Sequence, residues 1–156
     1  MGLATAPWIG SMTTFAMPQY ESIAQRASRQ YGIQVRRWRR TLSGRAILVR
    51  HADGRVDRWI ESPRPRSPVS LAVFLHEVGH HAVGFRRCWS LCEEEMRVWE
   101  WALNRMRRAG IDPNRRVLAR VERSMRHALA LAMRKSPGPP AGAGHARPAD
   151  SSTQTQ

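Results

Sequence analysis

The segment from Pro68 to Val83 predicts a helix that is apolar on almost every side, yet it contains two histidines and a glutamate. Ser67 is a typical N-cap before a proline at the first helical position, and Gly84 ends the pattern. A helix that is apolar all round must be buried, so the rest of the chain has to build a core around it. Polar side chains in such a core are costly unless something binds them.

The spacing of these polar residues predicts a zinc site. His76 and His80 are four residues apart, which places them on one face of the helix. Both imidazoles can therefore bind one Zn²⁺ ion at about 2.0–2.1 Å. Glu77 would lie close enough to a zinc-bound water to act as a general base. The alternative is a pair of ordinary core histidines beside a salt-bridged Glu77.

A catalytic zinc needs a third protein ligand and an open position for water. The candidates are three consecutive glutamates, Glu93, Glu94 and Glu95, at the start of the next predicted helix. Glu95 is preferred, because its face carries Val98, Trp99 and Ala102, of which Val98 and Ala102 are small enough to let the two helices approach closely. Glu94 is the second choice, since a bulky tryptophan shares its face.

Other potential ligands fit less well. His81 lies about 100° from His80 around the helix, which directs it away from the same ion. Cys88 or Cys92 is a weaker candidate ligand, since thiolates usually mark closed structural zinc sites. Two cysteines do not make a disulfide framework, so we expect both to be reduced. Amide hydrolysis also requires a donor that stabilises the oxyanion. No residue stands out for that role, and the candidates are His81 and His127.

The remainder of the pattern predicts an α+β fold. Three short strands begin near Ile33, Ala46 and Val56, with a hairpin turn at 52–54 between the last two. We expect them to form a small three-stranded antiparallel sheet that packs with an N-terminal helix and with the zinc-site helix. Two further helices follow.

The helical boundaries and the domain limits come from proline, glycine and capping signals. The predicted helices beside 68–83 are 18–31, 89–109 and 112–135, the last with Asp112 as N-cap and Pro113 at its first position. The expected organisation is a flexible N-terminal extension at 1–17, one domain at 18–135 and a disordered tail at 136–156.

The chain is strongly basic, with 26 Lys+Arg against 12 Asp+Glu and a formal net charge of +14. Arginines at the polar positions of the strands should make one face of the sheet very basic, and the helix 112–135 carries more of them around an apolar stripe. One interpretation is a nucleic-acid partner, and the other is an arginine-rich composition with solvated side chains. No stretch reaches the roughly 18 apolar residues of a membrane span, and the N-terminus lacks a basic signal region, so we expect a soluble cytoplasmic protein.

The motif residues also resemble a known family. His76-Glu77-Val78-Gly79-His80-His81, followed by Glu95-x-x-Val98-Trp99-x-Trp101-Ala102, is similar to the ImmA/IrrE family of small metallopeptidases. Members of that family carry H-E-[LIV]-G-H and then a glutamate ligand in an E-x-x-A-x-x-[FW]-A helix. The resemblance covers roughly residues 18–109. Val98 stands where the family has alanine, and Arg97 stands where an acidic residue is common.

The resemblance implies a gluzincin-like fold, with zinc on His76, His80 and a downstream glutamate and with Glu77 as catalytic base. It implies hydrolysis of a protein target such as a DNA-binding transcriptional repressor, in a stress response or on a phage or mobile element. The alternatives are a basic nucleic-acid-binding protein with a structural zinc, and a non-catalytic protein whose zinc fold docks a regulator.

Overall fold

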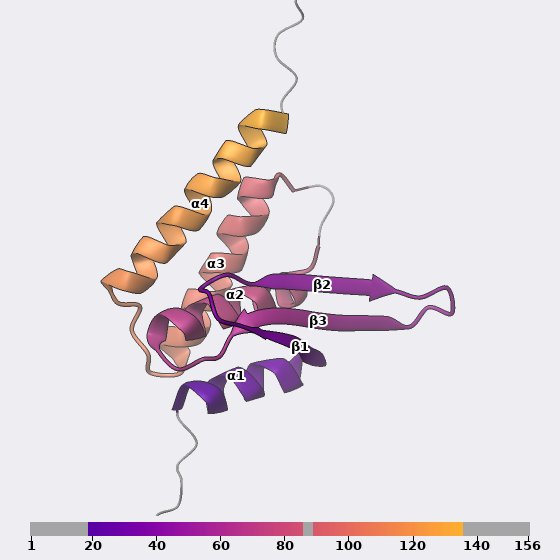
Figure 1. The fold of residues 1–156 in the computed structure, drawn as a ribbon, viewed down its shortest axis with the longest axis horizontal. Helices are drawn as coiled ribbons and strands as arrows, with labels where there is room; N and C mark the ends of the chain where they lie inside the picture. Colours follow the sequence, from indigo (N-terminus) through magenta and orange to yellow (C-terminus); the bar gives the residue numbers. More distant parts are fainter. Residues whose placement is uncertain (1–18, 86–88, 136–156) are drawn as a thin grey trace, which may run out of the picture.

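The computed structural model describes residues 19–85 and 89–135 (Figure 1). The fold is α+β, with an N-terminal helix, a three-stranded mixed sheet and three further helices. Its elements are α1 (Gln19–Gln30), β1 (Ile33–Arg39), β2 (Arg45–Arg50), β3 (Val56–Pro63), α2 (Pro68–Val83), α3 (Leu91–Arg108) and α4 (Arg115–Lys135). None of the described helices is both long and apolar enough to cross a membrane. The expected extension at 1–17 and tail at 136–156 lie outside the described residues, as does Cys88.

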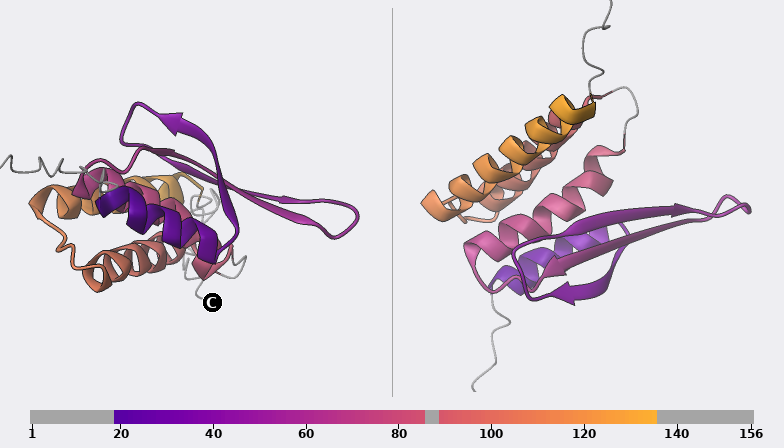
Figure 2. Two further views of the ribbon diagram at one scale, coloured as in Figure 1. Left: turned by 90° about the horizontal axis from the view of Figure 1, so that it is seen from below. Right: turned by 45° about the horizontal axis from the view of Figure 1, so that its top comes forward.

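The helix α2 is the centre of the fold, as its apolar sequence predicts. It lies between the sheet and the pair formed by α3 and α4, and it also packs against α1 (Figure 2). Its ten residues from Ser70 to Gly79 are all buried. Ser67 caps the helix, because its hydroxyl accepts a hydrogen bond from the Ser70 backbone N–H at 3.2 Å. Gly84 follows the helix with φ of 90°, a backbone conformation that favours glycine.

The prediction of a wholly antiparallel sheet was wrong. The strand order is β1-β3-β2, and β2 pairs with β3 in antiparallel fashion, but β1 pairs with β3 in parallel. The short segment 40–44 therefore leads from one edge of the sheet to the other instead of forming a hairpin. Strand β3 takes the central place, where Ile60 is fully buried and is covered by a neighbouring strand on each side. Only β2 and β3 form the predicted hairpin, in which Gly54 has φ of 85°.

The arginines of the strands are divided between the two faces of the sheet. The register places Arg37 and Arg45 opposite Glu61, whereas Arg50 and Arg58 belong to the face that carries Ile60. The predicted single basic face is therefore only partly correct. Glu61 also receives a hydrogen bond of 2.7 Å from Arg39, which links β1 to β3 and lowers the pKa of the glutamate.

The helix α4 begins later than the sequence predicts. Asn114, and not Asp112, caps it, because the Asn114 side chain accepts a hydrogen bond from the Val117 backbone N–H at 3.1 Å. The proline that we expected at the first helical position precedes the cap.

Candidate metal centre

Three side chains from two helices meet in the core and form a group that could hold a metal ion. His76 and His80 come from α2, and Glu95 comes from α3. The two histidine Nε2 atoms are 3.3 Å apart. One carboxylate oxygen of Glu95 lies 3.3 Å from the Nε2 atom of His76, and the other lies 3.5 Å from the Nε2 atom of His80. These are the three residues that the sequence predicts as ligands.

The spacing of the donor atoms matches what a tetrahedral zinc ion requires. Ligand atoms at about 2.0–2.1 Å from a tetrahedral ion lie about 3.3 Å from one another. The two histidine nitrogens, 3.3 Å apart, match that value, and each of them lies 3.3 or 3.5 Å from a different oxygen of the Glu95 carboxylate. Two imidazoles and one carboxylate are also a donor set of catalytic zinc sites, and they leave one coordination position for water. The residues therefore fit a zinc ion in both geometry and chemistry.

The site is held rigidly by its surroundings. His76 is only 5% exposed, and its ring stacks on Trp99 of α3 with centroids 4.1 Å apart. Burial lowers the pKa of His76, which favours the neutral imidazole that binds a metal. Burial also opposes the negative charge of Glu95, but its hydrogen bonds with both histidines hold its pKa well below the usual range. The free chain thus already has the ionisation states that two of the ligands need.

The three consecutive glutamates have three different roles. Glu94 lies 3.1 Å from the Nδ1 atom of His80, so it can fix the orientation and tautomer of that ligand. Glu93 accepts a hydrogen bond of 2.8 Å from the Ser90 backbone N–H and caps α3. Glu95 alone faces both histidines. The structure therefore brings the first choice, Glu95, into the group and places the second choice, Glu94, beside it.

Gly79 allows α2 and α3 to approach so closely. A Cβ atom at this position would lie 2.9 Å from the Cγ1 atom of Val98 and 3.2 Å from a ring carbon of Trp101. Val98 and Ala102 are fully buried in the same contact, in agreement with the expectation that small residues on the face of Glu95 permit it. The glycine in the motif is therefore a packing requirement, because its missing side chain brings Glu95 within reach of the histidines.

Glu77 belongs to α2, and its buried side chain lies beside the metal group and close to the start of strand β2. It is 6% exposed, and burial raises its pKa to about 7. Gly44, just before β2, lies against it so closely that a Cβ atom there would overlap the Glu77 carboxylate. The position and the raised pKa both suit a group that accepts and returns a proton near neutral pH.

A cavity of about 440 Å³ opens over the metal group. The start of β2, the helices α2 and α3, and one face of α4 form its walls. The α4 side chains include Arg120, Ser124 and His127, and the Ser124 hydroxyl lies 3.4 Å from a carboxylate oxygen of Glu95. Sequence reasoning missed the contribution of Arg120 and Ser124. Their helical spacing places them on one face with His127, but that spacing does not indicate which part of the fold the face meets.

The structure distinguishes between the remaining candidate residues, which are His81, His127 and Cys92. His81 faces the sheet, where its Nε2 atom lies 3.1 Å from the Trp59 carbonyl oxygen, and it does not line the cavity. His127 does line the cavity and is the better placed of the two candidate oxyanion donors. Cys92 is a free, partly buried cysteine outside the metal group.

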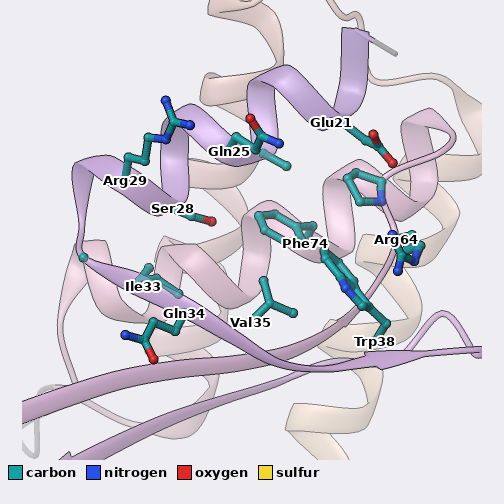
Figure 3. A pocket seen from close by; sticks show the side chains of 13 residues that line it. Glu21, Gln25, Ser28, Arg29, Ile33, Gln34, Val35, Trp38, Arg64 and Phe74 are labelled. Atoms are coloured by element: carbon teal, nitrogen blue, oxygen red, sulfur yellow. The ribbon is translucent and has the colours of Figure 1, made fainter. Parts of the chain in front are cut away.

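A second cavity of about 470 Å³ lies between α1 and β1, away from the metal group. Figure 3 shows Glu21, Gln25, Ser28 and Arg29 of α1 on one side of it, with Val35, Trp38 and Phe74 on the other. Its described lining contains no histidine or cysteine and only one carboxylate, Glu21. It therefore offers no comparable set of metal ligands, and the smaller cavity is the candidate functional site.

Comparison of the chain with known protein families, with curated proteins and with solved structures found no match. The likeness of the motif to the ImmA/IrrE family therefore remains a prediction. The metal group itself is the basis for a functional interpretation.

Proposed function

We propose that the protein is a zinc-dependent metallopeptidase of the ImmA/IrrE type that hydrolyses peptide bonds of a protein target such as a transcriptional repressor. One observation carries the proposal. The two histidine Nε2 atoms lie 3.3 Å apart, and each lies 3.3–3.5 Å from one oxygen of the Glu95 carboxylate, in an open cavity with the buried Glu77 carboxylate beside them. A purely structural zinc site would usually be closed by a fourth protein ligand.

The protein side chains supply the proton transfer. His76, His80 and Glu95 would hold a zinc ion, which when bound supplies a Lewis acid and lowers the pKa of a water molecule. Glu77 takes the proton of the attacking water and passes it to the leaving amine. Its buried position beside the metal group suits both steps. His127 is the side chain that we assign to the developing oxyanion.

The edge of the sheet provides a place for the peptide substrate. Strand β2 is at the edge of the sheet in the order β1-β3-β2, so its outer backbone groups are unpaired in the described part of the chain. Its first residues, Arg45 and Ala46, line the metal cavity. An extended peptide can add to such an edge through backbone hydrogen bonds. This arrangement would place a substrate amide beside Glu77.

The proposal is tested by measuring hydrolysis of a fluorogenic peptide library by the zinc-loaded protein. We expect hydrolysis that a chelator abolishes and added zinc restores. Glu77→Gln should lower kcat by roughly 10²–10⁴-fold with unchanged zinc content, because the amide cannot accept the proton. Glu100→Gln, an exposed position on α3, is the matched control and should behave like the wild type. Full activity of a zinc-loaded Glu77→Gln protein would exclude Glu77 as the general base.

A second candidate function is nucleic-acid binding with zinc in a structural role. It is favoured by the exposed arginines of α4, which include Arg115, Arg116, Arg123 and Arg126. Phosphate contacts from such residues make binding strongly dependent on salt. Replacing both His76 and His80 by alanine separates the two functions. DNA binding that persists in this folded double variant, in the absence of peptidase activity in the wild type, would favour the second candidate.

A further inference from the structure

The helix α4 brings positive charge to the mouth of the metal cavity. A smaller hollow of about 320 Å³ shares Arg120, Ser124 and His127 with the cavity and adds Leu42 and Arg123. No carboxylate lines this hollow among the described residues. Two guanidinium groups and an imidazole therefore give the hollow a basic lining, and Arg120, Ser124 and His127 connect it to the cavity over the metal group.

Arg120 is held in place by contacts that connect it to the metal group. Its Nε atom donates a hydrogen bond of 3.2 Å to the Leu42 carbonyl oxygen, and its guanidinium carbon lies 5.7 Å from the centre of the Trp99 ring. That ring also stacks on His76 at 4.1 Å. One aromatic side chain thus separates Arg120 from a metal ligand, so the guanidinium has a defined position relative to the metal group.

The Glu77 and Glu95 carboxylates act electrostatically on Arg120, but neither Arg120 nor Arg123 makes a direct contact with a counterion within the described part of the chain. Arg120 and Arg123 form no ion pair there, and the terminal nitrogens of Arg120 have no hydrogen-bond partner there. The nearby carboxylates of Glu77 and Glu95 have other roles, as proton acceptor and metal ligand. Arg120 is only partly exposed. A partly buried, unpaired guanidinium is costly, and its planar fork matches the two oxygens of a carboxylate.

We propose that Arg120 and Arg123 form a subsite that binds a carboxylate of the peptide substrate, adjacent to the bond that is cleaved. This inference rests on the metallopeptidase function proposed above and specifies its substrate class. The carboxylate belongs either to an aspartate or glutamate side chain or to the C-terminus of the peptide. The net charge of +14 would assist the approach of such acidic substrates.

Peptide hydroxamates test the subsite without requiring catalysis, because their hydroxamate group chelates an open zinc ion. Three compounds share one backbone. The first has a glutamate side chain and an amidated C-terminus, the second has glutamine and an amidated C-terminus, and the third has glutamine and a free C-terminal carboxylate. Titration calorimetry on the zinc-loaded full chain measures each Kd. We expect the first or the third compound to bind about tenfold more tightly than the second, as a charge-assisted hydrogen bond allows.

Substitutions connect this preference to the arginines. Arg120→Gln and Arg123→Gln should each reduce the preference toward equal binding. Arg116→Gln is the matched control, since Arg116 is exposed on the same helix and lines neither cavity, and it should keep the preference. A preference for the first compound identifies a side-chain carboxylate, and a preference for the third identifies the C-terminus.

Two results would overturn the inference in different ways. Equal binding of all three compounds by the wild type, or an unchanged preference in both arginine variants, would exclude the subsite while leaving the zinc peptidase intact. Failure of every hydroxamate to bind the zinc-loaded protein would show that the ion has no open position. That outcome would overturn the proposed peptidase function, and the subsite with it.

Discussion

The three glutamates at the start of α3 show how adjacent identical side chains acquire different chemistry. Successive residues of a helix are rotated by about 100°, so Glu93, Glu94 and Glu95 face different surroundings. Glu93 bonds to the Ser90 backbone, Glu94 reaches the outer nitrogen of His80, and Glu95 reaches both inner nitrogens. The three roles follow from the direction in which each side chain leaves the helix. Alanine substitutions can separate these roles.

Alanine at each glutamate should give three distinct results in a zinc titration. Glu95→Ala should cause the largest loss of zinc affinity, because it removes a ligand. Glu94→Ala should weaken zinc binding by about 10–100-fold, since it removes the group that orients His80. Glu93→Ala should leave zinc affinity unchanged and lower the free energy of unfolding slightly, because it removes the side chain that completes the capping box with Ser90. A larger loss in Glu94→Ala than in Glu95→Ala would reverse the assignment of the ligand.

The metal group could be predicted from the sequence because its geometry is local. The spacing of His76 and His80 fixes their common face, and the small residues beside Glu95 indicate which glutamate faces α2. Arg120 and Ser124 could not be assigned in the same way. Their approach to the site depends on how α4 packs across α3, and no short spacing in the sequence determines that contact.

The contact between α2 and α3 is the element on which the metal group depends. Gly79 leaves room for Val98, and this close approach brings Glu95 to the histidines. Helix propensity alone would favour alanine over glycine by about 1 kcal/mol in the middle of α2. The glycine therefore serves the packing of the two helices and not the stability of α2 itself.

Gly79→Ala should destabilise the protein in spite of its better helix propensity. The new Cβ atom would lie 2.9 Å from the Cγ1 atom of Val98, so the Val98 side chain or the helix α3 must move. Overpacking of this kind typically costs about 1–3 kcal/mol, and the displacement should also weaken zinc binding. Chemical denaturation and zinc titration measure the two effects. Adding Val98→Ala should recover part of both losses, and an increase in stability of the single variant would contradict the close contact.

The order and direction of the strands in the sheet cannot be predicted from the pattern of residues within a single strand. Alternation of apolar and polar residues fixes which side chains share a face, and it is the same for parallel and antiparallel neighbours. The hairpin between β2 and β3 was correctly predicted from its turn residues. The position of β1 was not, because it depends on β3 taking the centre of the sheet, with Ile60 covered from both sides.

At the scale of the whole molecule, the candidate site joins the two halves of the fold. The helix α2 packs against the sheet and α1 on one side and against α3 and α4 on the other (Figure 2). A metal ion held by α2 and α3 would connect these halves at their centre. Metal binding should therefore be linked to the stability of the entire domain.

Removal of zinc should lower the melting temperature. An ion that binds only the folded chain stabilises it by about 2.7 kcal/mol when its free concentration is a hundredfold above Kd. For a domain of this size that corresponds to roughly 10 °C. Calorimetry of the protein with zinc and with a chelator measures this difference in melting temperature. The melting temperature of Glu95→Ala should be almost the same under both conditions. Equal melting temperatures of the wild type under both conditions would mean that zinc does not bind the folded protein.

The central claim is that His76, His80 and Glu95 hold one zinc ion, and metal analysis of the purified protein tests it most directly. The informative pair is His80→Ala and His81→Ala, because these neighbouring histidines face the metal group and the sheet, respectively. We predict about one zinc per chain in the wild type and in His81→Ala, and almost none in His80→Ala. Zinc retained by His80→Ala at the wild-type level, or a wild type that binds no zinc, would contradict the claim.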